Sequence, residues 1–440
     1  MSDGKIGLPE SVSMAVGGMV GGGIFAVLGV VAGTAGTLAW IAFIVAGIVA
    51  ASAGYSFNRL NDLTDEPSGP IRFVEQFTGR TTLAGMTGWT FIFGYVGTMA
   101  MYAFAFGGYF TELVGVHTVA ALPLRPVVSV LTVALFVGLN TAGAHASGRT
   151  EDVLVGLKVA ILLLFGLGGL YFGFTHGKIE SGFSQFSVGP LVAAAISFVA
   201  FEGWELLMFD QGSIRDPEST VKKAIYISIA TATFLYVIVA VVTTNLVAPA
   251  QIKAHAETSL AIAAKPFLGH LGFLLISVAA LFSTGSAINA TLFSASRLST
   301  ELATEDFLPN AINRSGGEPV RALLVLGALT AIFTFFGSLD GITSFASLAF
   351  ITIFGLVSAL AFRERDSAVV TWLVPAIGAI GASATVLALL WHLYTAEPNV
   401  FGTVVLIGIA VIGVEVLYFE HEPLVEEATH LEQEVEETIE

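Results

Sequence analysis

The chain has 440 residues, of which 55% are hydrophobic and only 12% are charged, and it contains no cysteine. Water-soluble domains carry about 25% charged residues, and a soluble core stops growing near ~250–300 residues, so this composition excludes a soluble globular protein. The lack of cysteine also excludes disulfides, thiolate metal sites and cysteine nucleophiles.

The charged residues are mainly acidic, with 34 Asp and Glu against 18 Lys and Arg. Residues 421–440 hold eight Glu and no Lys or Arg, which is half of the net charge of −16. Such a tail argues against a nucleic-acid partner, because nucleic-acid binding depends on basic side chains. An acidic, cysteine-free chain with few lysines is typical of a salt-adapted organism such as a halophilic archaeon. The alternative explanation of the net negative charge is the acidic tail alone, without adaptation to salt.

Apolar stretches long enough to cross a membrane recur along the whole chain, since a bilayer core takes ~20 residues of helix. The first is rich in glycine and follows only one basic residue, so it is not a cleaved signal peptide. The predicted spans are residues 8–32, 35–57, 84–111, 126–141, 151–174, 190–212, 224–247, 271–296, 320–337, 341–362, 369–394 and 399–419. The sequence therefore predicts an all-α integral membrane protein with twelve transmembrane helices in a lipid bilayer.

Basic residues are distributed unevenly over the two sides that these crossings create. If the N-terminus is cytoplasmic, 13 of the 18 Lys and Arg lie in inner segments, and Lys158 lies within a span. The outer segments hold only Arg125, Lys178, Lys253 and Lys265. Because basic residues favour the cytoplasmic side, we predict a multi-pass protein of the cytoplasmic membrane with both termini inside.

The first span contains five glycines between Gly17 and Gly23, at the middle of the membrane. Each glycine costs ~1 kcal/mol relative to alanine in a helix interior. Close packing against another helix needs glycine on one face only, whereas here glycine covers every face. The run therefore predicts irregular backbone, which within a membrane must be buried in protein or line a cavity.

The sixth span places Glu202 and Glu205 on either side of Gly203 in the middle of an apolar stretch. An ionisable group at the membrane centre costs at least ~2.5 kcal/mol and usually marks a function. Interruptions in the first and sixth spans favour an inverted repeat, in which spans one to five match spans six to ten. The freed backbone amides and carbonyls suit the carboxylate and the ammonium of a zwitterion.

Lys158 is the third informative residue, because no carboxylate lies three or four positions away on either side. At ~1.5 Å per residue from Glu151, it lies ~10 Å into its span. Its side chain either extends to the inner membrane surface or is a buried amine that faces the interior. A buried amine favours its neutral form, so it could load and release a proton, or take the place of a sodium ion.

Motifs of enzymes are missing from the chain. There is no His-Glu-x-x-His, no Gly-x-Ser-x-Gly and no His/carboxylate cluster, and the glycine run lacks the Gly-Lys-Ser/Thr ending of a phosphate loop. We therefore predict no catalytic residues, no metal site and no cofactor. A receptor or nutrient sensor that binds a solute without moving it remains an alternative from another class.

The glycine run, the interrupted sixth span and three later segments together resemble the amino acid–polyamine–organocation (APC) transporter superfamily over nearly the whole chain. Residues 17–25 are similar to its first-helix pattern Gly-x-x-Ile-Gly-Ser-Gly-Ile-Phe, and residues 198–205 to its sixth-helix pattern Phe-x-Ala-Phe-x-Gly-Phe-Asp/Glu. Residues 283–291, 307–309 and 319–322 resemble the eighth helix and the loop that follows it.

The resemblance implies a LeuT-like fold, in which helices 1 and 6 are broken and two five-helix inverted repeats enclose the substrate. The first repeat would cover residues 1–175 and the second residues 190–362. Two peripheral helices would follow over residues 369–419, and the acidic cytoplasmic tail over residues 420–440.

The resemblance also implies an amino acid substrate and its contacts. Its carboxylate would meet backbone amides in the first span, its ammonium would meet backbone oxygens in both broken spans, and an aromatic ring would cover it. The implied substrate-binding residues are Val20, Gly21, Gly22, Gly23, Val199, Phe201, Glu202, Trp204 and Glu205, with Trp204 as the first candidate for the lid. Met101, Tyr102 and Ser347 are candidates for the pocket floor.

Lys158 matches a fifth-helix lysine of proton-coupled members, and Ser283 and Thr284 are its implied neighbours on the eighth helix. We therefore expect uptake of amino acids by alternating access, coupled to protons through Lys158. Sodium-coupled symport and amino acid exchange are the alternatives.

Two residues depart from the superfamily pattern. Gly22 stands where a serine or threonine is common, and Glu202 stands where an apolar residue is usual. Glu202 could add a preference for cations, serve a proton pathway or face a seam between proteins, and the sequence leaves these three roles open.

Overall fold

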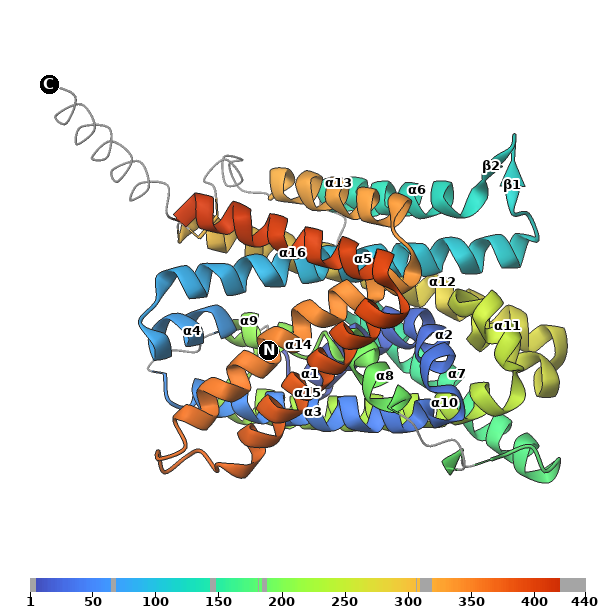
Figure 1. Cartoon of the computed structure of the whole chain (residues 1–440), viewed down its shortest axis with the longest axis horizontal. Coiled ribbons are helices and arrows are strands. Elements are labelled where there is room, and N and C mark those ends of the chain that lie inside the picture. Colours follow the sequence, from blue (N-terminus) through green and yellow to red (C-terminus); the bar gives the residue numbers. More distant parts are fainter. Residues whose placement is uncertain are drawn as a thin grey trace, which may run out of the picture.

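The computed structural model describes residues 5–64, 69–142, 148–180, 182–183, 188–305, 307–308 and 319–419. Within these ranges the chain is almost entirely helical, and the only paired strands are those of a short hairpin, β1 (Thr118–Val119) and β2 (Leu122–Pro123) (Figure 1). The predicted all-α class is confirmed. The predicted acidic tail lies outside the described residues.

The helices follow one another through short connections. The first half holds α1 (Leu8–Gly18), η1 (Met19–Gly23), α2 (Ile24–Ala35), η2 (Gly36–Leu38), α3 (Ala39–Asn61), α4 (Pro70–Thr78), α5 (Thr81–Val114), α6 (Leu124–Thr141) and α7 (Gly148–Thr175). The second half holds α8 (Gly189–Ser197), η4 (Phe198–Phe201), α9 (Leu206–Phe209), η5 (Gln211–Ser213), α10 (Pro217–Leu246), α11 (Pro249–Ala254), η6 (Ala256–Thr258), α12 (Ser259–Thr304), α13 (Val320–Phe336), α14 (Leu339–Arg363), α15 (Leu373–Ala396) and α16 (Pro398–Phe419).

Nine helical segments of the described chain are long and apolar enough to cross a membrane. One of them, Leu8–Asn61, is divided at Gly36, whose φ of 57° and ψ of −136° lie outside the α-helical region. Two shorter apolar helical stretches, α13 and Pro398–Gly413 of α16, add further apolar surface. The chain is therefore a multi-pass membrane protein.

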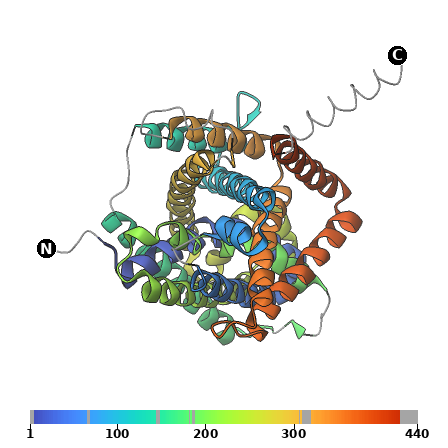
Figure 2. The same ribbon diagram turned by 90° about the vertical axis from the view of Figure 1, so that its left-hand side faces the viewer.

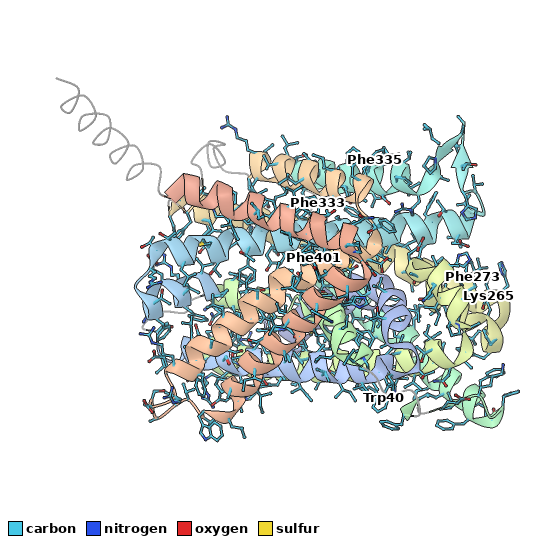
Figure 3. All side chains as sticks on the ribbon, viewed as in Figure 1. Trp40, Lys265, Phe273, Phe333, Phe335 and Phe401 are labelled. Atoms are coloured by element: carbon cyan, nitrogen blue, oxygen red, sulfur yellow. The ribbon has the colours of Figure 1, made fainter. Side chains whose placement is uncertain are left out.

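Buried and lipid-facing helices are arranged as inner and outer layers. Seen along the long axis, α5 runs near the middle, while α6 and α13 lie along one outer edge and α16 along the next (Figure 2). The outer helices present large apolar side chains to the surroundings, among them Leu131 of α6. Phe335 of α13 is another (Figure 3). This outward apolar surface is what a protein whose solvent is lipid requires.

The two ends of the helix bundle carry different elements and different charged side chains. Arg59 and Lys222 both pair with Asp62 near the end that carries α4, at 3.1 and 2.6 Å (Figure 1). The opposite end carries α11 and the hairpin, and there Lys265 lies 4.3 Å from the ring of Phe273 (Figure 3). The α4 end is the one that the distribution of basic residues assigns to the cytoplasm.

Close packing of η6 on α2 and α5 covers the interior from the α11 end. A Cβ atom on Gly29 of α2 would lie 1.9 Å from the carbonyl oxygen of Ala256, and one on Gly108 of α5 would lie 2.4 Å from Cγ of Glu257. Gly29 therefore requires glycine, because a side chain there would displace the backbone of η6, whereas a side chain at Gly108 would displace only the side chain of Glu257.

We expect Gly29→Ala to lower the midpoint of thermal unfolding of the purified protein, because overpacking costs about 1–3 kcal/mol. Gly33→Ala on the same helix is the matched control. Nothing lies within 4 Å of its Cβ position, so its midpoint should stay unchanged or rise. Equal midpoints for the two variants would contradict this close packing.

Candidate functional site

The sixth span is interrupted at its middle, as the sequence predicts. Helix α8 ends at Ser197, a 3₁₀ turn follows over Phe198–Phe201, and Glu202 is extended with φ −73° and ψ 147°. Gly203 then takes a φ of 121°, which residues with a side chain rarely adopt. The chain returns to helix only at Leu206, so the backbone between α8 and α9 lacks the regular helical hydrogen bonds.

The first span is irregular in a different way from the expected break. Residues Met19–Gly23 form a π-helical turn, η1, which joins α1 to α2 without unwinding. Neighbouring elements confine this turn, because a Cβ atom on Gly23 would lie 2.8 Å from Cα of Ala200. The glycines thus serve close approach rather than an open break, and single π turns are frequent at functional sites.

The π turn of the first span and the non-helical segment of the sixth span are the two interruptions of regular α-helix, and they touch each other through their backbones. A Cβ atom on Gly18 would lie 2.9 Å from Cα of Gly203, so neither glycine leaves room for a side chain. Tyr236 of α10 reaches both segments, with its Oη 2.7 Å from the carbonyl oxygen of Met19 and 2.8 Å from that of Ala200. One hydroxyl hydrogen serves both acceptors, so Tyr236 links the two interruptions directly.

Two serines from other helices complete the backbone bonding of these segments. Ser283 of α12 donates from Oγ to the carbonyl oxygen of Val20 at 3.3 Å. Ser347 of α14 donates to the carbonyl of Ile196 at 2.6 Å and accepts from the Val199 amide at 3.1 Å. Thr284, by contrast, bonds within its own helix, to the carbonyl of Ala280.

Both carboxylates of the sixth span are buried, with exposed fractions of 2% for Glu202 and 0% for Glu205. Glu205 accepts from the Gly203 amide at 2.7 Å and from Oη of Tyr95 at 3.3 Å, so it holds the turn in place. Glu202 accepts from Oη of Tyr102 at 3.3 Å. Both tyrosines lie on α5, so this helix faces the interruption along its length.

The position of Tyr102 explains one departure from the superfamily pattern. A Cβ atom on Gly22 would lie 2.2 Å from Cδ1 of Tyr102, so the tyrosine ring occupies the space that a serine or threonine side chain would need. Position 22 therefore requires glycine, because the ring of Tyr102 fills the space of any side chain.

The two aromatic candidates of the sixth span point to different neighbours. Trp204 packs between Phe57 of α3 and Phe354 of α14, with centroid distances of 5.1 and 4.9 Å. Phe201 instead packs edge-on against Tyr236 at 5.3 Å. Phe201 is thus the ring beside the contact of the two interruptions.

Lys158 lies inside the protein, with an exposed fraction of 4%. Its helix α7 packs against α1 and η1, and a Cβ atom on Gly17 would lie 2.8 Å from Cγ2 of Val155, one turn before Lys158. The side chain does not extend along the outer surface of the bundle, which is what snorkelling would require.

A cavity of about 1360 Å³ leads toward this region. Its lining includes Lys5 and Arg297 at the α4 end and, farther along the bundle, Gly18 and Tyr95. Because Tyr95 bonds to Glu205, the cavity reaches the interruption of the sixth span. It also opens at the side of α12, where Val278 and Phe282 of its lining are 41% and 63% exposed. At the other end of the bundle, η6 covers the region.

Comparison with known proteins identifies the family. A family model described as amino acid permease matches residues 6–414. The chain belongs to this amino acid permease family. It is a membrane transporter of a small molecule, and not an enzyme.

Curated relatives match over most of their length. An uncharacterised protein of Methanocaldococcus jannaschii is 35% identical over 80% of each chain. The inner membrane transport protein YbaT of Escherichia coli is 30% identical over 82% of this chain and 84% of its own. The methylthioribose transporter of Bacillus subtilis is 26% identical over 87% of this chain and 86% of its own. The two relatives with a stated role are transporters.

We expect Tyr236→Phe to lower the midpoint of thermal unfolding and the rate of solute uptake. The substitution removes the donor shared by two buried carbonyls, at a cost of about 1–3 kcal/mol. Tyr171→Phe is the control, since that ring is 74% exposed on α7. Thermal unfolding and uptake into vesicles measure both effects. A Tyr236→Phe variant as stable and active as the control would contradict the role of this hydroxyl.

Proposed function

We propose that the chain takes up amino acids across the cytoplasmic membrane by alternating access. The observation that carries this proposal is the contact of two interrupted helices, where Tyr236 and Ser283 meet the carbonyls of Met19, Ala200 and Val20. Polar backbone concentrated at membrane depth suits a ligand that carries both a donor and an acceptor group. A free amino acid is the smallest ligand of that kind.

The substrate carboxylate would bind the amides of Gly21, Gly22 and Gly23 once the continuous helix α1–η1–α2 unwinds at η1, since free amides at a helix N-terminus attract anions. Its ammonium would bind the carbonyl oxygens of Val20, Val199 and Glu202. Burial of all six residues supports the proposal, because a dry site strengthens these charge-assisted hydrogen bonds.

Twelve membrane crossings with a LeuT-like 5+5 inverted repeat account best for the order of the apolar helices along the chain. The nine candidate segments become ten when Leu8–Asn61 is divided at Gly36, and α13 and α16 make twelve. The interrupted first and sixth crossings would then begin the two repeats, residues 1–175 and 190–362. The crossings over 369–419 would be peripheral.

The conformation fits one state of an alternating-access cycle. The cavity extends from the α4 end to Tyr95, whereas η6 packs tightly on α2 and α5 at the other end. If the α4 end is cytoplasmic, this state faces inward. Outward opening would then require η6 to move away from Gly29 and Gly108.

Proton coupling through Lys158 is the favoured driving force. The burial of Lys158 beside η1 supports it, because a buried amine changes its charge when its surroundings become wet or dry. Ser283, on the facing helix, bonds to Val20 of η1, which would pass a change at the amine to the substrate site. Sodium-coupled symport and exchange are the rival modes, and a sensor that binds without transport is the rival class.

We expect Lys158→Ala to abolish amino acid uptake into reconstituted vesicles driven by a pH gradient without sodium. Removing the amine removes the proposed proton carrier, while Lys223→Ala, at an exposed position, should transport normally. Normal uptake by Lys158→Ala would sink proton coupling through this residue. Uptake driven only by a sodium gradient, or only after preloading with amino acid, would establish symport with sodium or exchange instead.

The cysteine-free chain allows a direct topology test with single introduced cysteines. Leu122→Cys lies in the hairpin at a 62% exposed position, and Thr81→Cys lies exposed at the start of α5. In intact cells an impermeant maleimide should label Leu122→Cys, and should label Thr81→Cys only after permeabilisation. The opposite pattern would invert the proposed orientation, and labelling of both from one side would remove α5 as a crossing.

A further inference from the structure

One face of α5 carries Tyr95, Thr98 and Tyr102, at the spacing of i, i+3 and i+7 that brings side chains together on a helix. The two tyrosines reach across to the interrupted sixth span and donate to Glu205 and Glu202. Thr98 lies between them on this face.

The hydroxyl of Thr98 is fully buried and has no hydrogen-bond partner among the residues that the structure describes. Thr87 and Thr90 of the same helix each donate to the carbonyl four residues earlier, at 2.8 Å. A buried hydroxyl without a partner costs about 1–3 kcal/mol. Because it lies between the two tyrosines on this face, the Thr98 hydroxyl is available as a partner for a bound molecule.

Glu202, which accepts from Tyr102 on the same face of α5, has a complementary requirement. Its side chain is 2% exposed, and its hydrogen-bond partner is a neutral tyrosine hydroxyl, Tyr102. Burial of a carboxylate is costly unless a cation or a proton compensates it. A ligand ammonium would compensate the charge, and its three N–H donors would serve Glu202 and Thr98 at once.

The same side chains adjoin the proposed binding site for the substrate backbone. The ring of Tyr102 covers Gly22, whose amide belongs to that site, and the carbonyl of Glu202 is one of the proposed ammonium acceptors. A substrate bound there would direct its side chain toward α5. Trp204 points away, into the contact with Phe57 and Phe354, so it leaves this side to Glu202.

We infer that Glu202, Thr98 and Tyr102 form a subsite for a positively charged side chain, so that the preferred substrates are amino acids with a basic side chain. This inference rests on the proposed function and adds the substrate class to it. Glu202 accepts hydrogen bonds from the distal ammonium or guanidinium group, Thr98 accepts one more, and Tyr102 orients the carboxylate.

Equilibrium binding of L-lysine and L-norleucine to the purified full-length protein tests the subsite, because their side chains have the same carbons and only lysine carries an ammonium. The wild type should bind lysine at least about tenfold more tightly. Glu202→Gln should lose at least about tenfold in lysine affinity and change norleucine affinity by less than about twofold. Thr98→Val should lose about threefold in affinity for lysine and none for norleucine. Its control, Thr90→Val, should keep the wild-type affinity for both ligands.

Equal affinities of the wild type for the two ligands would overturn the subsite. So would a Glu202→Gln variant that keeps the wild-type preference or weakens both ligands equally, which would make Glu202 a proton carrier or a structural residue. If Glu202→Gln does not fold, the wild type and Thr98→Val decide. Binding and uptake of neutral amino acids without a lysine preference would leave the proposed function intact, whereas no binding of any amino acid would remove both.

Discussion

The direct contact between two interrupted helices is the constraint on which the rest of the molecule depends. Gly18 and Gly203 bring the two backbones together, and neither position tolerates a side chain. Within a membrane such irregular backbone must find its hydrogen bonds in the protein, and Tyr236, Ser283 and Ser347 supply them from three other helices. The surrounding helices are arranged so that these three hydroxyls reach the same region.

The same constraint links stability to transport. Each hydroxyl bonds a carbonyl of an interrupted segment, so a movement of either segment must exchange these bonds for others. Tyr236 shares one hydrogen between Met19 and Ala200, which makes this link easy to shift from one acceptor to the other. A packed core held by exchangeable bonds moves between discrete arrangements rather than deforming continuously.

Much of this could be predicted from the sequence, because the decisive signals are local. Apolar length predicts the helices, the glycine run predicts irregular backbone in the first span, and Glu202 with Gly203 predicts the interruption of the sixth. The form of the first irregularity could not be predicted, since a π turn depends on the neighbours that confine Gly22 and Gly23. Tyr236 and Thr98 were also missed, because each looks like an ordinary helical residue. Their roles arise from contacts with residues far away in the chain.

We propose that an amino acid binds where the two interrupted helices meet, with its side chain toward α5. The most direct measurement is an experimental structure of the full-length protein in lipid nanodiscs, saturated with the amino acid that it transports fastest. We expect the ligand carboxylate at the amides of Gly21–Gly23 and the ligand side chain beside Glu202 and Thr98. Ligand density elsewhere in the molecule, under conditions in which the protein transports that amino acid, would contradict this binding site.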